Sequence, residues 1–263
     1  MAAVGGAGTR TPAGPGARWT RNWRPRAGAA VNLLCLPHAG GSAGVYRSWA
    51  DGLPAEVDLH VVQYPGREDR FTETPLSRMD DLADAVTEAI RPLFEKDVVL
   101  FGHSMGASVA YEVTRRCEAA GLMPRLLLVS GRAAPGRPES GGTTPRAART
   151  DEEIVAEIRG FGGSGVAALD NPELREVVLP MIRADYRLVD GYRPERPGPV
   201  GAPIAVLRGR DDAGVTPGGG AAWSALTTAR CTEHVFDGGH FYLQEHERQV
   251  LATLTDLVAQ ALR

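Results

Sequence analysis

The sequence Asp97-Val98-Val99-Leu100-Phe101-Gly102-His103-Ser104-Met105-Gly106 joins an apolar run directly to a G-x-S-x-G motif. Apolar residues at helical spacing follow over residues 109–117, and this pattern stops at Gly121. A serine between small residues, placed between a buried strand and a helix, is typical of a nucleophile elbow, whose sharp turn exposes the hydroxyl. The N-terminus of the helix favours negative charge that develops beside it. The sequence therefore predicts a strand–turn–helix unit that presents Ser104 as a nucleophile.

Four further apolar runs of strand length lie on either side of this unit, and a fifth is weaker. The four are Val31–Leu36, Val57–Val62, Leu126–Val129 and Ile204–Leu207, and the weaker run is Cys231–Phe236. Helical patterns lie between the runs, and a last helical pattern follows Arg248. Continuous apolar runs that alternate with amphipathic helices indicate an α/β fold, with a mostly parallel sheet flanked by helices.

The composition excludes several classes of protein. The 263 residues are 43% hydrophobic and 23% charged, and the formal net charge is −3, so no basic field favours nucleic acid. No apolar run approaches the roughly 18–20 residues that a membrane span needs. Three widely spaced cysteines, Cys35, Cys117 and Cys231, suggest buried thiols in a reducing compartment rather than a disulfide framework or a zinc site. We expect a cytoplasmic protein with no nucleic-acid or membrane partner and, since no apolar seam requires a second copy, a monomer.

Two segments depart from the alternation. Residues 1–28 are rich in Gly, Ala, Pro and Arg, which predicts a flexible N-terminal tail before a single domain over residues 29–263. Residues 145–197 contain no strand pattern, but they carry two helix starts, a capping box that begins at Thr150 and the pair Asn171-Pro172. We expect this helical insertion to form a lid over a pocket.

A serine hydroxyl needs a base, and in a fold with this elbow the acid and then the histidine follow the serine along the chain. His240 lies in a loop directly after the last predicted strand, which favours it as the general base. His234 lies within that strand, and His246 lies in a polar stretch beyond it.

The acid that orients this imidazole is expected after the strand at 204–207. Asp211 and Asp212 both lie there, and their spacing does not separate them. Asp237 is too close to His240 along the chain to reach its far ring nitrogen easily. The N–H of Met105 and the N–H of Ala39, in the small-residue loop after the first strand, are the expected oxyanion donors.

In its motifs the chain resembles the type II thioesterases of polyketide and nonribosomal peptide synthases, which belong to the α/β-hydrolase superfamily. The ordered set of matching segments spans residues 31–250 and is more specific than the elbow alone. These segments are Leu36–Ser42, Gln63–Arg70, Gly102–Ala107, Ser130–Pro135, Leu179–Tyr186 and Gly238–Leu243.

The resemblance implies an α/β-hydrolase fold with Ser104 as nucleophile, His240 as base, and oxyanion donors at Ala39 and Met105. It selects Asp212 as the acid, through a G-x-x-D-x-x-V pattern that begins at Gly209. The implied reaction is hydrolysis of acyl thioesters on the phosphopantetheine arm of an acyl or peptidyl carrier protein, which removes aberrant acyl groups. No metal or other cofactor is expected.

Two other functions are compatible with the same motifs. A carboxylesterase or acyltransferase would use the same three side chains, and a hydrolase-like fold can also be retained as a non-catalytic binding module. The charged segment 63–70 is predicted to brace a loop rather than to contact substrate, and Arg67 and Arg183 receive no assigned role.

Overall fold

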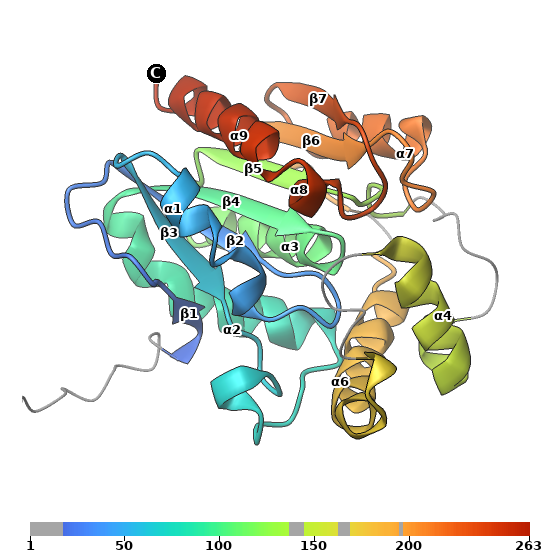
Figure 1. Cartoon of the computed structure of the whole chain (residues 1–263). Helices are drawn as coiled ribbons and strands as arrows, with labels where there is room; N and C mark the ends of the chain where they lie inside the picture. The colour runs from blue at the N-terminus through green and yellow to red at the C-terminus, as the bar shows by residue number, and fades with distance from the viewer. Residues whose placement is uncertain (1–17, 137–144, 163–168, 195–196) are drawn as a thin grey trace, which may run out of the picture.

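A computed structural model describes residues 18–136, 145–162, 169–194 and 197–263. Its centre is a seven-stranded sheet in the order β1-β3-β2-β4-β5-β6-β7, in which only the β1–β3 pair is antiparallel (Figure 1). The strands are β1 (Thr20–Arg21), β2 (Val31–Leu36), β3 (Val57–Val62), β4 (Asp97–His103), β5 (Leu126–Ser130), β6 (Ile204–Gly209) and β7 (Cys231–Phe236). The α/β class and the six predicted strands are confirmed.

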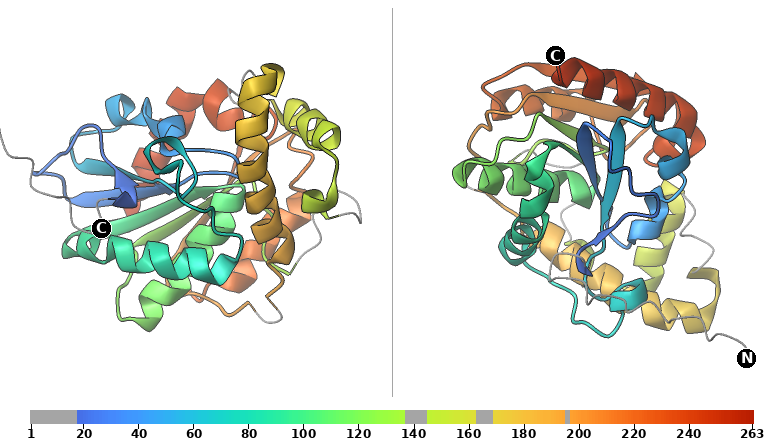
Figure 2. Two further views of the ribbon diagram at one scale, coloured as in Figure 1. Left: turned by 90° about the horizontal axis from the view of Figure 1, so that it is seen from below. Right: turned by 90° about the vertical axis from the view of Figure 1, so that its left-hand side faces the viewer.

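Helices lie on both faces of the sheet, whereas α4 and α6 pack together beyond the carboxyl ends of its strands (Figure 2). The helices are α1 (Trp49–Gly52), α2 (Met79–Ile90), α3 (Met105–Ala119), α4 (Asp151–Phe161), α6 (Pro172–Gly191), α7 (Pro217–Ala221), α8 (Tyr242–Glu245) and α9 (Glu247–Ala261). Alternate side chains of β2 separate the two cores: Leu34 packs with α2 and α3, whereas Leu33 packs with α1 and α9. Both faces of β2, β4 and β5 are therefore buried, which explains their continuous apolar runs, whereas the edge strand β7 is partly exposed.

The N-terminal boundary differs from the sequence prediction. Residues 1–17 lie outside the described residues, but residues 18–28, which were expected to belong to the flexible tail over 1–28, are folded onto the sheet. Thr20 pairs with Val62 at the edge of the sheet, and the indole ring of Trp19 lies 4.1 Å below the guanidinium carbon of Arg70. Arg26 donates hydrogen bonds to three backbone carbonyls of residues 50–57. The arginines of this segment donate hydrogen bonds to residues far along the chain, and composition does not reveal the stabilisation that these bonds supply.

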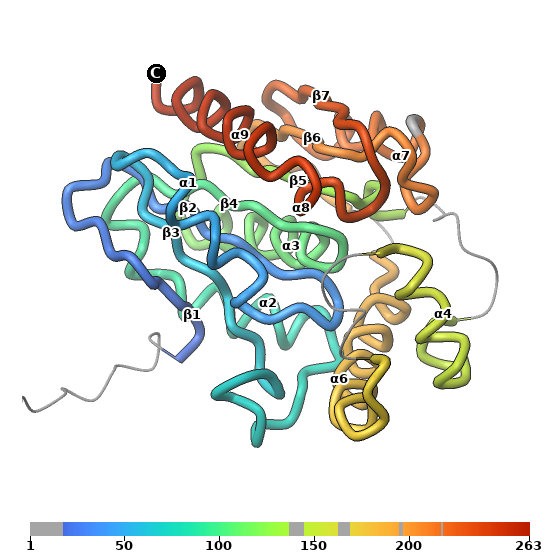
Figure 3. The backbone as a smooth tube through the Cα atoms, viewed as in Figure 1, coloured from blue at the N-terminus to red at the C-terminus, as the bar shows by residue number. Residues whose placement is uncertain are grey.

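The insertion between β5 and β6 is helical in its described residues (Figure 3). α4 begins at the predicted capping box, where the Thr150 hydroxyl accepts from the Glu153 N–H at 3.2 Å, and Asn171 caps α6. The apolar side chains of α6 are only partly buried, since Leu174 and Val177 are exposed. Within the described ranges, no helix has both the length and the apolarity that a membrane span requires.

Candidate active site

Ser104 lies in the turn between β4 and α3 with strained backbone angles. Its φ of 55° and ψ of −118° fall outside the regions that L-residues favour, as the predicted elbow requires. The turn is too tight for side chains at the flanking glycines. A Cβ at Gly102 would lie 2.1 Å from the Gly106 carbonyl oxygen, and one at Gly106 would lie 2.0 Å from the Leu36 oxygen. The two glycines therefore allow α3 to begin directly beneath the serine.

Ser104 lines a cavity of about 200 Å³ at the carboxyl ends of the strands. His240, Ala39 and Met105 line the same cavity. Its opposite wall comes from the insertion and is mostly apolar, with the side chains of Ile158, Phe161, Leu169, Val178, Ile182 and Tyr186. The insertion thus lies over the predicted nucleophile, which is the position expected of a lid.

Asp212 holds the imidazole of His240. Nδ1 of His240 lies 2.8 Å from Oδ2 of Asp212, and the other carboxylate oxygen accepts the Gly214 N–H at 2.9 Å. The Asp212 side chain is fully buried, so neither contact competes with water. Because Nδ1 donates to the carboxylate, Nε2 of the neutral ring is the nitrogen that can accept a proton.

The other acids and histidines considered from the sequence lie elsewhere. Asp211 is exposed, and Asp237 is exposed and paired with Arg210 at 3.1 Å. His234 lies within β7, where its Nε2 is 3.3 Å from the Thr232 hydroxyl, and His246 precedes α9. None of the four residues lines the cavity. The structure thus separates Asp212 from Asp211, which the chain order left open.

Aromatic rings surround the His240 imidazole. The Phe161 ring of α4 lies 4.8 Å from it, and the Phe241 ring lies at 5.2 Å. His103, the residue before Ser104, lies at 4.9 Å and is fully buried; its Nδ1 is 2.9 Å from the Ser130 hydroxyl. Burial lowers the pKa of His103 well below its ordinary value, and the nearby His240 lowers it further, so His103 is neutral at pH 7.

The loop after β2 carries Ala39, whose N–H is the expected second oxyanion donor. The Gly41 N–H donates to the His38 carbonyl at 2.9 Å, and the Gly40 N–H donates to Asp185 at 2.7 Å. Both groups are thus engaged away from a substrate, which favours Ala39 over them as the donor. Met105 is the first residue of α3, where N–H groups point out of the helix without intrahelical acceptors.

Two charged residues of this region are buried, and the sequence indicated no function for either of them. Arg67, from the segment after β3, and Asp185, from α6, are each 3% exposed in their side chains and form an ion pair. The pair joins segments 118 residues apart, so no local pattern indicates it. Among the described residues, no three His, Cys, Asp or Glu side chains are grouped in a way that could hold a metal ion.

Comparison with known proteins gives consistent matches. A family model described as a thioesterase domain matches residues 31–258. The probable cadicidin biosynthesis thioesterase of Streptomyces griseus is 37% identical over 250 residues, which are 94% of this chain and 66% of that protein. The type II thioesterase BorB from the borrelidin biosynthetic cluster is 43% identical with a TM-score of 0.83, over 94% of this chain and 98% of that one. YbtT, a type II thioesterase from the yersiniabactin pathway, is 29% identical with a TM-score of 0.83, over 93% of this chain and 100% of that one.

Proposed function

The chain belongs to the thioesterase family, and on that premise we propose that it is a type II thioesterase that uses Ser104 as its nucleophile. Its substrates are acyl groups on the phosphopantetheine arm of acyl or peptidyl carrier proteins, and it removes aberrant groups that block polyketide or nonribosomal peptide synthases. The observation that carries the proposal is the hydrogen bond between His240 and the buried Asp212, because it orients the imidazole in the cavity that Ser104 also lines.

The reaction has two steps, and His240 moves the proton in both. The Ser104 hydroxyl attacks the thioester carbonyl carbon while its proton passes to Nε2 of His240. The carbon–sulfur bond then breaks, and His240 gives the proton to the departing pantetheine thiol. In the second step, water gives a proton to His240 as it attacks the acyl-serine ester, and the acid leaves as the serine recovers its proton. Asp212 stabilises the imidazolium in each step.

Negative charge develops on the substrate carbonyl oxygen in both steps. Ala39 and Met105 line the cavity, and their N–H groups are proposed to bind this oxygen. The Met105 N–H also lies at the start of α3, where the helix dipole favours negative charge. The proposed chemistry draws every proton transfer from protein side chains and water, so it needs no metal or redox cofactor.

The apolar wall of the cavity suits the acyl part of the substrate. Its side chains come mainly from α4 and α6, so the insertion contributes most of the surface that an acyl chain would contact. Burial of methylene groups against such a surface favours binding by about 0.8 kcal/mol per group. A general carboxylesterase or acyltransferase would use the same three side chains, but the matching family model and the relatives named above are thioesterases.

The proposal is tested with a panel of acyl groups loaded on a carrier protein. We expect release of the free acid by the wild-type protein, no release by Ser104→Ala, and slower cleavage of simple aryl esters of the same acids. Rapid cleavage of aryl esters with no action on any carrier-bound thioester would contradict the proposed substrate class. Failure of a fluorophosphonate probe to label Ser104 would contradict the proposed mechanism and support a binding module.

A further inference from the structure

We propose that Arg67 and Asp185 are positioning residues for the oxyanion site: together they fix the loop 37–41 that carries the Ala39 N–H. Arg67 also neutralises the Asp185 carboxylate, which would otherwise place an unpaired negative charge on the Gly40 N–H, one residue from the proposed oxyanion donor. This inference rests on the proposed function and assigns a role to the segment 63–70 and to the middle of α6.

Asp185 connects α6 to the centre of the loop. Its Oδ2 accepts the Gly40 N–H at 2.7 Å and also accepts from Nη2 of Arg67. The helix α6 packs closely on the loop at this point, since a Cβ at Gly40, where φ is +77°, would lie 3.1 Å from the side chain of Ile182. The peptide unit that follows Ala39 is therefore held by one carboxylate oxygen. A shift of that oxygen would rotate the peptide and move the neighbouring Ala39 N–H.

The segment around Arg67 holds both ends of the same loop. The Tyr64 hydroxyl donates to the Pro37 carbonyl at 3.2 Å, and Oε1 of Gln63 accepts the Ala43 N–H at 2.7 Å. Nε2 of Gln63 donates to the Arg67 carbonyl at 2.9 Å, and the Arg67 guanidinium lies over the Tyr64 ring at 5.0 Å. The loop is thus fixed at its start, through Asp185 at its centre, and just beyond its end, and Arg67 takes part in the central contact.

Arg67 and Asp185 should differ in their electrostatic effect on the reaction rate. A carboxylate beside an oxyanion opposes the charge that forms in the transition state, and burial strengthens this repulsion because little water screens it. With Arg67 in contact, the Arg67–Asp185 pair carries no net charge. Loss of the Arg67 cation should therefore slow the reaction more than loss of the Asp185 charge, because an asparagine at 185 still offers an oxygen to the Gly40 N–H.

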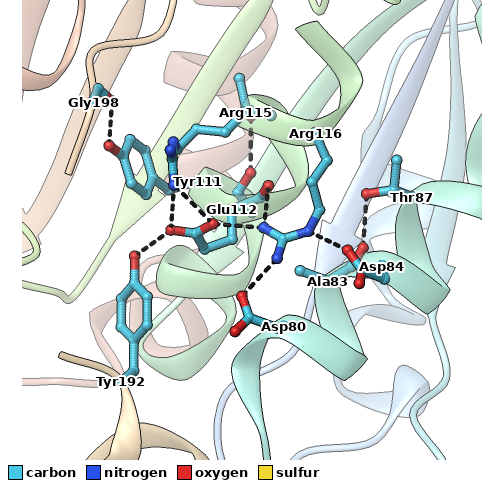
Figure 4. Close-up of polar contacts among 12 residues, drawn as sticks. Asp80, Ala83, Asp84, Thr87, Tyr111, Glu112, Arg115, Arg116, Tyr192 and Gly198 are labelled. Carbon is cyan, nitrogen blue, oxygen red and sulfur yellow. Dashed lines mark hydrogen bonds and ion pairs between the residues drawn. The ribbon is translucent and has the colours of Figure 1, made fainter. Parts of the chain in front are cut away.

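The test compares Arg67→Gln and Asp185→Asn with a control pair of the same kind. Glu112 of α3 is 3% exposed, and it pairs with Arg116 at 2.6 Å and accepts from the Tyr192 hydroxyl at 2.8 Å (Figure 4). It lies about two helical turns from Ser104 and contributes nothing to the cavity. Glu112→Gln therefore disturbs a buried ion pair without touching the loop 37–41.

The readout is the rate at which a fluorophosphonate probe labels Ser104, measured with the kcat and KM of a short acyl-pantetheine thioester. Displacement of a reacting group by about 1 Å costs about 100-fold in rate, so we expect Arg67→Gln to label about 100-fold more slowly. We expect a loss of about tenfold for Asp185→Asn, and Glu112→Gln should stay within twofold of wild type. The losses should appear in kcat, with KM changed less than threefold. Arg67→Lys keeps the cation and should recover part of the rate.

Urea denaturation of each variant separates positioning from folding. If Arg67→Gln and Asp185→Asn label within threefold of wild type while their stability falls as in Glu112→Gln, the pair is only structural and the inference is overturned. If Arg67→Gln does not fold, Asp185→Asn and Arg67→Lys carry the same comparison, and wild-type labelling by both would overturn it. A wild-type protein that labels readily but hydrolyses no thioester would contradict the proposed function alone, because the labelling comparison needs no thioester.

Discussion

Replacement of Asp212 by asparagine should reverse the tautomer of His240. Oδ1 of Asp212 accepts the Gly214 N–H at 2.9 Å, so the amide oxygen of an asparagine will occupy that position. Its NH₂ group then takes the place of Oδ2, 2.8 Å from Nδ1 of His240. Nδ1 has to accept that hydrogen bond, which moves the ring proton to Nε2. The imidazole can then no longer accept the proton of Ser104.

The expected loss is large because the base itself is disabled rather than displaced. A wrong tautomer in a serine–histidine–acid site lowers kcat by about 10⁴-fold, which corresponds to about 5.4 kcal/mol of transition-state stabilisation. The side chain changes by one atom type and keeps its shape, so the fold should be retained. KM should change little, since Asp212 does not line the cavity.

The assay is steady-state release of thiol from an acyl-pantetheine thioester, followed with a chromogenic disulfide reagent. Asp211→Asn is the matched control, because it makes the same chemical change at the adjacent, exposed residue. We expect that control to keep its kcat within twofold. Equal losses in the two variants, or a loss below tenfold in Asp212→Asn, would refute the tautomer argument.

Four further predictions concern the nucleophile, the pH dependence and the core. Ser104→Ala should abolish turnover and leave the melting temperature unchanged, measured by thioester hydrolysis and thermal unfolding; activity near wild type would exclude Ser104. Burial lowers the pKa of His103 in the folded protein, so below pH 6.5 the unfolded chain binds more protons and the free energy of unfolding falls with the pH. His103 contributes at most about 1.4 kcal/mol to this fall for each pH unit. Between pH 7.5 and 5.5, urea titrations should therefore show a smaller loss of stability for His103→Gln than for the wild type, and equal losses would contradict this. Gly131→Ala should lower both stability and kcat, because φ is +59° there and the new Cβ would lie 2.6 Å from Cε1 of His103; wild-type values for both would contradict the strain. Leu254→Ala, at a fully buried position of α9, should lower the free energy of unfolding by about 2–5 kcal/mol, and a loss below 1 kcal/mol would contradict its place in the core.

The sequence alone determined the features that depend on neighbours a few residues apart. The elbow is one of them, because the glycines at 102 and 106 and the serine between them fix a turn that few other residues could adopt. The strand runs are another, since burial on both faces leaves a continuous apolar run. The helix starts at Thr150 and Asn171 depend on capping groups within three residues. Each of these predictions agrees with the structure because the interactions are local.

Chain order and spacing did not decide which acid contacts the histidine, whereas the tertiary structure shows the contact directly. Asp211 and Asp212 are adjacent and chemically identical, and the residue pattern around them left both open until the family pattern was considered. Their difference lies in burial and in a contact with His240, which lies 28 residues away from Asp212. Such a contact depends on how β6 and β7 end side by side. The catalytic roles themselves remain predictions for the variants above.

The same reason explains the fold features that were mispredicted or missed. Residues 18–28 read as a tail because Gly, Ala, Pro and Arg offer no periodicity, yet Arg26 finds carbonyl acceptors on the segment 50–57. The sequence could not predict the Arg67–Asp185 pair for a related reason. A buried charge is tolerated only where a partner of opposite charge meets it, and the sequence does not reveal which of 29 basic residues meets which of 32 acids. That pairing is set when the sheet and the insertion pack together.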